Sequence, residues 1–127
     1  ATPDYLDRHP PITHPSQLHA HRWLHFLPVR TTLQNGEESY FLDVADSIAC
    51  THLAAVRGLT ESGFGLSLQV GGEVREKIAQ GRLKVVLPEW TLPPVSLYLV
   101  TPYRVQSAKT EAAVRIFTES FAKEGDL

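Results

Sequence analysis

Residues 47–68 read SIACTHLAAVRGLTESGFGLSL, and this stretch decides the fold class. Ser47–Cys50 favours an extended run, Thr51–Ser62 has the apolar spacing of a helix, and Phe64–Leu68 is again rich in residues that favour strands. Gly63 is expected to end the helix in the left-handed conformation that glycine adopts most easily. A strand, a helix and a second strand in this order predict an α/β fold with parallel pairing.

Similar patterns extend over the rest of the chain. Asn35-Gly36 is a strong signal for a tight turn before a strand at 38–44. Gly58 lies inside the first helix, where glycine costs about 1 kcal/mol relative to alanine, so close packing is the expected reason for it. We expect further helices at 72–80 and 107–123, and further extended runs at 22–27, 83–87 and 95–101. In the last helix the stripe predicted to be buried is Ala113, Val114, Phe117 and Phe121.

The composition limits the classes of function. At 127 residues with 43% apolar side chains, the chain is long enough for one domain with a real core. A net charge of −2 and the lack of a Lys/Arg cluster argue against direct DNA binding by this chain. The single cysteine, Cys50, suits a cytoplasmic location, and no apolar run approaches the roughly 20 residues of a membrane helix. Methionine is absent even at position 1, so the chain is expected to begin inside a longer protein.

The candidate metal-binding and catalytic patterns are weak. His19, His21 and His25 are closely spaced, but a zinc site needs converging ligands, and no HExxH or paired-cysteine spacing is present. Cys50 and His52 are two residues apart at a strand-to-helix junction, where a thiol and an imidazole seldom meet. We therefore expect no metal, no cofactor and no catalytic residues.

Two glycines follow the first helix, in Ser62-Gly63-Phe64-Gly65. They resemble part of a dinucleotide-binding fingerprint, but the third glycine is missing, and the motif follows a helix instead of a strand. We interpret Gly63 as a helix cap and Gly65 as a close approach of two backbone segments.

The start of the first helix is a candidate binding site. A helix N-terminus presents unpaired N–H groups and a partial positive charge, so it can hold a carboxylate or another anion. Thr51 adds a hydroxyl group at this point. The alternative is that Thr51 only caps its own helix, and the pattern alone leaves both interpretations open.

Several passages, in their order and spacing, resemble the effector-binding domain of LysR-type transcription regulators. They are Pro3–His9, Pro15–Leu18 with His21-Arg22, Gly63–Leu68, Ile78–Leu83 with Val86–Trp90, and Pro93–Pro102 with the helix from Ser107 to Phe117. The passage IAQGRLKVVLPEW at 78–90 is similar to the family pattern LAAGRLVPVLPDW. One departure is Leu68-Gln69-Val70, where the family usually has LLP, so the shape of that loop is expected to differ.

The resemblance implies a periplasmic-binding-protein-like (type 2) α/β fold that is incomplete here. Residues of about 5–90 would form the second subdomain, about 91–94 a crossover, and about 95–124 a return to the first subdomain. The family's winged helix-turn-helix and the first part of the effector domain are absent from this chain. Pro88, Pro93 and Pro94 independently suggest a stiff connector at the crossover.

The resemblance also implies a function, which is sensing and not catalysis. It places a small effector against Thr51, His52, Cys50, Gly63 and Phe64, and an anion would suit the start of the helix. It also implies that His21 is a structural residue. The implied partners are the effector, further copies of the protein in a dimer or tetramer, and DNA only through a domain outside this chain; no membrane is implied. The alternatives are a fragment of a solute-binding protein or of an enzyme that uses Cys50 and His52.

Overall fold

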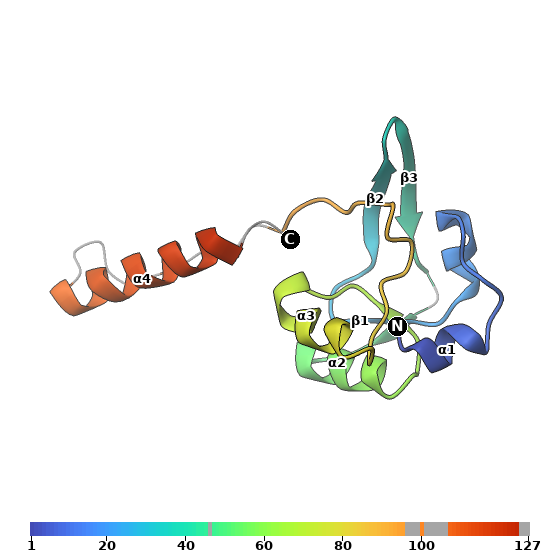
Figure 1. The fold of residues 1–127 in the computed structure, drawn as a ribbon, viewed down its shortest axis with the longest axis horizontal. Coiled ribbons are helices and arrows are strands. Elements are labelled where there is room, and N and C mark those ends of the chain that lie inside the picture. Colours follow the sequence, from blue (N-terminus) through green and yellow to red (C-terminus); the bar gives the residue numbers. More distant parts are fainter. Residues whose placement is uncertain (46, 96–99, 101–106, 125–127) are drawn as a thin grey trace. The chain divides into compact units, whose positions relative to one another are not determined.

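The computed structural model describes residues 1–45, 47–95, 100 and 107–124 (Figure 1). The chain divides into two compact units, Ala1–Pro93 and Pro94–Leu127, which we describe separately. The elements of the first unit are α1 (Pro3–Asp7), the 3₁₀ helix η1 (Pro15–Ala20), β1 (Trp23–His25), β2 (Arg30–Asn35), β3 (Glu38–Asp43), β4 (Ser47–Ala49), α2 (Leu53–Glu61), β5 (Leu66–Ser67) and α3 (Gly71–Ala79). The second unit contains α4 (Ala108–Glu124).

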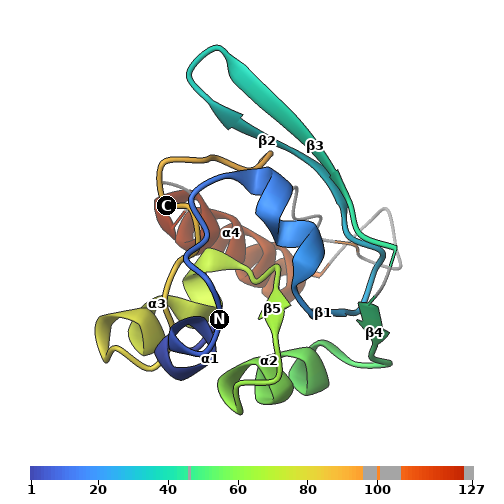
Figure 2. The ribbon, with the colours of Figure 1, turned by 90° about the vertical axis from the view of Figure 1, so that its right-hand side faces the viewer.

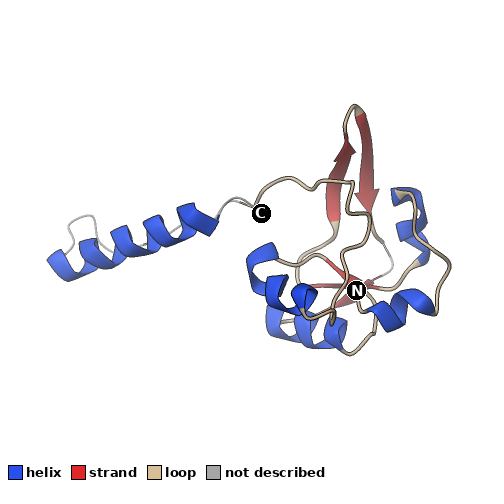
Figure 3. Ribbon diagram, in the orientation of Figure 1, coloured by secondary structure: helices blue, strands red, loops and turns tan. Residues whose placement is uncertain are grey.

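A three-stranded parallel sheet in the order β4-β1-β5 forms the centre of the first unit (Figure 3). Leu24 is aligned with Ile48 of β4 on one side and with Ser67 of β5 on the other. Helix α2 connects β4 to β5 and crosses β1 on the way. The predicted strand–helix–strand unit with parallel pairing is therefore confirmed.

The two faces of this sheet carry different side chains because successive strand residues point in opposite directions. Leu24 has no exposed surface, and α2 packs against β1 and β5. Trp23 and Leu66 belong to the hydrophobic core on the other face. The buried members of this core are Tyr5, Leu18, Trp23, Val29, Leu33, Leu42, Val44, Leu66, Leu87 and Trp90.

The β2–β3 hairpin extends away from the parallel sheet in both views (Figures 1 and 2). Its strands pair antiparallel from Arg30↔Asp43 to Asn35↔Glu38, and Gly36 has a φ of 59° in the turn. The tight turn predicted from Asn35-Gly36 is confirmed. On its other edge, Gln34 of β2 forms an isolated bridge with Thr91.

Some predictions for the first unit are wrong. Helix α2 begins after His52 and not after Thr51, because His52 is the residue that keeps an extended backbone at the cap. A β-carbon on Gly58 would meet no atom within 4 Å, so close packing does not explain this glycine. The apolar run 83–87 is no strand, since Lys84 exchanges backbone hydrogen bonds with Ala1 alone among the described residues and Leu87 has a φ of 54°.

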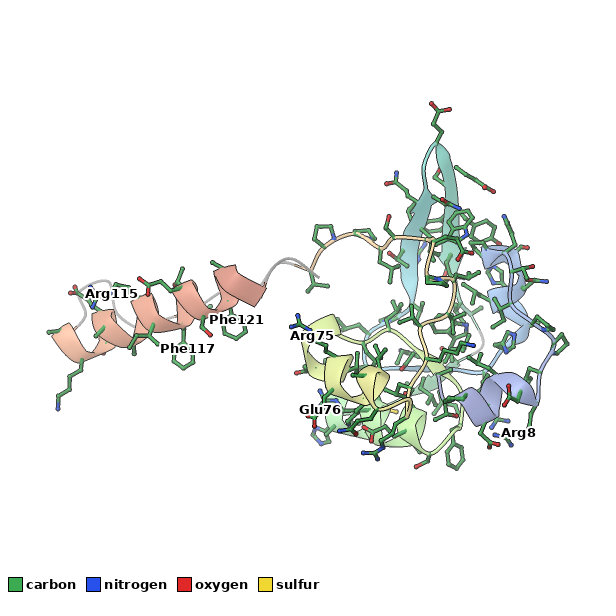
Figure 4. The ribbon with its side chains drawn as sticks, in the orientation of Figure 1. Arg8, Arg75, Glu76, Arg115, Phe117 and Phe121 are labelled. Carbon is green, nitrogen blue, oxygen red and sulfur yellow. The ribbon has the colours of Figure 1, made fainter. Side chains whose placement is uncertain are left out.

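In the second unit the predicted helix is present but its stripe is not buried. Phe117 and Phe121 project from the same side of α4 and are 53% and 50% exposed (Figure 4). Ala113 is also exposed, whereas Val114 is partly buried. The apolar periodicity is real, but the described residues of this unit offer no second layer to cover it. Most of the predicted run at 95–101 lies outside the described residues.

Candidate functional site

The carboxyl ends of β1, β4 and β5 lie at one edge of the sheet because the strands are parallel. In open α/β sheets, ligands bind outside this edge. The residues that follow the strands here are Phe26 after β1, Cys50 and Thr51 after β4, and Leu68 and Gln69 after β5. Three of the predicted site residues, Cys50, Thr51 and His52, therefore lie at the carboxyl edge of the sheet.

Cys50, Thr51 and His52 differ in how firmly they are held. The backbone N–H of Cys50 donates a hydrogen bond of 2.8 Å to the carbonyl oxygen of His25, which ties it to the end of β1. Cys50 is partly buried, whereas Thr51 and His52 are exposed. A fixed backbone thus presents two exposed polar side chains at the start of α2.

At the N-terminus of α2, the N–H groups of Leu53 and Ala54 have no hydrogen-bond partner in the described part of the chain. His52 is the N-cap residue but its side chain makes no capping hydrogen bond, and the first turn contains no acidic residue. Its carbonyl oxygen accepts from the N–H groups of Ala55 and Val56. The free N–H groups before them and the helix dipole leave a partial positive charge beside Thr51.

Helix α3 begins at the same edge but is electrostatically complemented. Its N-cap residue, Val70, also lacks a side-chain capping bond, but Glu73 lies in its first turn. Glu73 pairs with Arg57 of α2. Of α2 and α3, α2 is therefore the helix whose first turn contains no acidic residue.

A polar cluster beside β5 was missed by the sequence analysis. The Thr60 and Ser67 hydroxyl oxygens are 2.7 Å apart, and Nε2 of Gln69 lies 2.8 Å from the Ser67 oxygen. Ser67 and Gln69 are two residues apart in a β-rich run, so their shared face could have been inferred from the alternation. The contact to Thr60 depends on how α2 packs on the sheet.

Gly63 and Phe64 are not brought together with the other three predicted residues. They follow the opposite end of α2, and nine helical residues span about 13 Å. Gly63 has a φ of 79°, and its carbonyl oxygen accepts from the Arg8 guanidinium at 3.3 Å. Phe64 is 48% exposed. An effector role for these two residues stays a prediction.

The three closely spaced histidines, His19, His21 and His25, have separate environments. His21 is buried, and its Nδ1 lies 3.1 Å from the Tyr5 hydroxyl. Burial, and then the neighbouring His9, lowers the pKa of His21 below its ordinary value of 6.5. His19 contacts the Tyr40 hydroxyl, and Nδ1 of His25 is buried without a hydrogen-bond partner in the described residues. Within residues 1–45, 47–95, 100 and 107–124, His, Cys, Asp and Glu do not gather in threes as metal ligands.

Two shallow grooves lie elsewhere on the first unit. A groove of about 590 Å³ runs between Leu6–Ile12 and Lys84–Pro88. A smaller one, of about 220 Å³, is lined by His19–Arg22 together with Ser47 and Ile48. Neither of these two grooves includes a predicted site residue.

A parallel sheet whose strands β4 and β5 are joined by helix α2 places the first unit in the α/β class. The family model described as the LysR substrate binding domain matches residues 1–122, and the chain belongs to this family. The fold is that of the periplasmic-binding-protein-like regulatory domains of LysR-type regulators, and the chain corresponds to part of such a domain.

Two curated relatives are transcriptional regulators. The chain is 28% identical to the HTH-type transcriptional regulator PtxR of Pseudomonas aeruginosa over 129 residues, which cover 98% of this chain and 41% of PtxR. It is 30% identical to the probable HTH-type transcriptional regulator SinR of Salmonella typhimurium, over 82% of this chain and 35% of SinR. The relatives are transcriptional regulators and not enzymes, and the chain spans less than half the length of each.

Solved structures give the same assignment. Full-length AphB, a virulence activator of Vibrio cholerae, matches with a TM-score of 0.66 and 28% identity, over 73% of this chain and 33% of AphB. The regulatory domain of AphB from Vibrio vulnificus matches with a TM-score of 0.59 and 32% identity, over 71% of this chain and 47% of that chain.

Among the helices of the described residues, none combines the length and the apolar character needed to cross a membrane.

Proposed function

We propose that this chain is the effector-sensing part of a LysR-type transcription regulator and binds a small anion at the carboxyl edge of the β4-β1-β5 sheet. The observation that carries the proposal is the N-terminus of α2, which has neither a side-chain cap nor an acidic residue in its first turn. The exposed Thr51 precedes it by two residues. In this proposal Thr51 donates its hydroxyl hydrogen to the anion, and His52 lies beside it.

The electrostatics favour an anion over a neutral ligand. Free N–H groups and the aligned peptide dipoles stabilise a negative charge at a helix N-terminus by about 0.3–1 kcal/mol at an exposed site, and by more where water is partly excluded. The hydrogen bond between Cys50 and the carbonyl oxygen of His25 holds the approach to α2 in one conformation. The effector therefore does not have to order this segment when it binds.

The cleft and the relay to DNA belong to the complete regulator. Residues of about 5–90 act as the second subdomain, about 91–94 as the crossover and about 95–124 as a return to the first subdomain, which supplies the opposite wall. The effector stabilises one geometry of the two subdomains, and a dimer or tetramer transmits it to helix-turn-helix domains. The names of the relatives PtxR and SinR, both HTH-type regulators, support this role, and we propose a cytoplasmic location for the protein.

The test is calorimetric titration of the full-length protein with benzoate and hexanoate, and with benzamide as a neutral control. We expect both carboxylates to bind and benzamide to bind at least tenfold more weakly. Thr51→Val removes a hydrogen bond to a charged group and should weaken carboxylate binding about tenfold. Thr32→Val, on the hairpin, is the matched control and should bind as the wild type does. Equal binding by Thr51→Val and wild type would contradict the proposed site.

A further inference from the structure

Near its end, the first unit is joined to the hairpin by a single rung on the edge of β2 that faces away from β3 (Figure 1). The N–H of Thr91 donates to the carbonyl oxygen of Gln34 at 2.7 Å, and the N–H of Gln34 donates to the carbonyl oxygen of Thr91 at 3.0 Å. The Thr91 hydroxyl group donates to the same Gln34 oxygen at 3.2 Å. Three hydrogen bonds thus join one residue of the hairpin to one residue of the segment that leaves the unit.

The residue before the rung is held in the core, and the residues after it are not. Trp90 is 8% exposed and belongs to the hydrophobic core, where its ring meets the His14 ring edge-on at a centroid distance of 5.6 Å. Leu92 and Val95, in contrast, are 47% and 82% exposed. In the described part of the chain, Thr91 is therefore the last residue of the first unit that is hydrogen-bonded to the hairpin.

The register explains why the pairing stops after one rung. In an antiparallel ladder, the next pair that exchanges hydrogen bonds lies two residues further along each strand. Beyond Gln34 and Thr91, this pair would be Thr32 and Pro93. Pro93 has no N–H to donate, so one of the two hydrogen bonds of this rung cannot form. Among the described residues, Thr32 has no main-chain partner on this edge of β2.

Pro94 has a different place in the same register. It would lie opposite Thr31, in a pair that exchanges no hydrogen bonds, and an N–H at this position would point away from β2. The missing N–H of Pro94 therefore removes no bond from the ladder. Two adjacent prolines thus differ in their effect on pairing, and this difference can be tested.

We propose that Thr91 is a fixed pivot for the connector that leads to the second unit, and that Pro93 keeps the pivot in place. The rung to Gln34 and the burial of Trp90 hold the exit point of the chain. Pro93 prevents the connector from pairing further along β2, and each residue that paired would shorten the free connector by about 3.3 Å. The pivot thus fixes both the start and the length of the connector. This inference rests on the proposed role of residues 91–94 as the crossover.

The role of Pro93 is tested by hydrogen exchange in the full-length protein, measured by mass spectrometry with residue-level fragmentation. Pro93→Val restores the N–H and favours an extended backbone, so the second rung should form and slow the exchange of the Thr32 N–H by about tenfold. Pro94→Val is the matched control and should leave the exchange of Thr32 as in wild type. If both substitutions slow it, or neither does, Pro93 is not the stop.

The rung itself is tested by a substitution on β2. Gln34→Pro removes the donor to Thr91 at an edge position where proline is tolerated, so the Thr91 N–H should exchange about fivefold faster. Thr32→Pro is the matched control, because it removes an N–H on the same edge that has no partner in the described residues. Circular dichroism establishes that each variant is folded. Equal exchange of Thr91 in the two variants would exclude the rung as the anchor.

The pivot is tested by the distances between two spin labels in the full-length protein, measured by double electron–electron resonance. The labels are attached through Glu76→Cys on α3 and Arg115→Cys on α4, both exposed (Figure 4), with Cys50→Ser and any other reactive cysteine replaced. Labelled protein is diluted with unlabelled protein so that distances within one chain dominate. Gln34→Pro should widen the distance distribution about 1.5-fold or more, and Thr32→Pro should not. An unchanged width in Gln34→Pro overturns the pivot, even if Thr91 exchanges faster.

The pivot and the proposed effector site can fail separately. Neither the exchange nor the distance measurement uses an effector, so their failure leaves the titration of Thr51→Val with carboxylates unaffected. Conversely, a lack of carboxylate binding would reject the anion site and leave the measurements on Gln34 and Pro93 unchanged.

Discussion

A β-carbon on Gly65 would lie 2.4 Å from the carbonyl oxygen of Arg22. The same oxygen accepts a 2.9 Å hydrogen bond from the N–H of Leu66, so this is the point where β5 joins β1. The neighbouring atom is backbone and cannot rotate away. Gly65 is therefore required by the closeness of two strands, and its own φ is not the reason.

Gly65→Ala should lower the free energy of unfolding by about 1–3 kcal/mol, because the backbone at the β1–β5 junction must shift to admit a methyl group. Equilibrium urea denaturation measures the change. Gly58→Ala is the control, since its β-carbon would meet no atom within 4 Å in the middle of α2, and it should stabilise the protein by up to about 1 kcal/mol. Equal effects of the two substitutions would contradict the close contact at Gly65.

Glu61 joins α2 to α3 and should make stability depend on acid pH. Its carboxylate accepts a hydrogen bond from Lys77 and lies 3.5 Å from Arg82. The hydrogen bond from Lys77, and then the surrounding cations, lowers the pKa of Glu61 below 4.5. A carboxyl group with a lowered folded-state pKa stabilises the protein above its unfolded-state pKa and loses this effect as the pH falls through the folded-state value.

The measurement is the Tm of wild type and Glu61→Gln from pH 7 to pH 3. Wild type should be the more stable at pH 7, and the difference should shrink once the pH falls below about 4.5. Glu37→Gln, at the exposed hairpin turn, is the control and should follow the wild type throughout. A difference between wild type and Glu61→Gln that does not change with pH would rule out the linkage.

His21 should produce a second pH dependence, nearer to neutrality. It is buried against Tyr5 and His9, whose ring centroids lie 5.8 Å and 5.2 Å from its own, and burial is the main cause of its lowered pKa. The unfolded chain therefore binds a proton at His21 more readily than the folded chain does. Stability should fall as the pH drops below 6.5, until the folded-state pKa is passed.

His21→Gln removes this titration, so its Tm should change less than that of wild type between pH 7.5 and pH 5.5. The substitution also loses packing, which lowers the Tm at every pH but does not change the slope of Tm against pH. His52→Gln replaces an exposed histidine and should keep the wild-type slope. The same slope in His21→Gln as in wild type would show that His21 does not carry the pH dependence.

The parts of the fold that were predicted correctly depend on neighbours in the sequence. The strand–helix–strand unit, the turn at Asn35-Gly36 and the cap at Gly63 all follow from local patterns of two to four residues. The interpretation of Gly65 as a close approach of two backbone segments is also confirmed, but it was not inferred from a turn or helix pattern. A glycine beside an apolar strand run, with no turn to explain it, indicates a neighbouring backbone.

The parts that were missed depend on contacts that local patterns do not encode. Residues 83–87 have the apolar content of a strand, but a strand needs a paired neighbour, and within the described residues Ala1 provides one bridge only. The apolar stripe of α4 was predicted, but periodicity alone does not show whether another layer covers Phe117. At the carboxyl edge, the departure at Gln69 was visible in the sequence, but the hydrogen bonds that join Ser67 to Gln69 and to Thr60 depend on how α2 packs on the sheet.

The hydrogen-bond chain at Thr60 can be tested by stability alone. Thr60→Val keeps the shape of a side chain that is 1% exposed, but leaves the Ser67 hydroxyl without its acceptor, so it should cost about 1–2 kcal/mol of unfolding free energy. Thr118→Val is the matched control. The Thr118 hydroxyl also donates to a carbonyl oxygen four residues earlier, but it is exposed on α4, and its loss should change stability by less than about 0.5 kcal/mol.

The double variant tests whether the two hydroxyl groups depend on each other. Adding Ser67→Ala to Thr60→Val removes the unpaired hydroxyl and should recover part of the lost unfolding free energy, because the two residues are coupled. If the double variant instead shows the sum of the two single effects, Thr60 and Ser67 act independently.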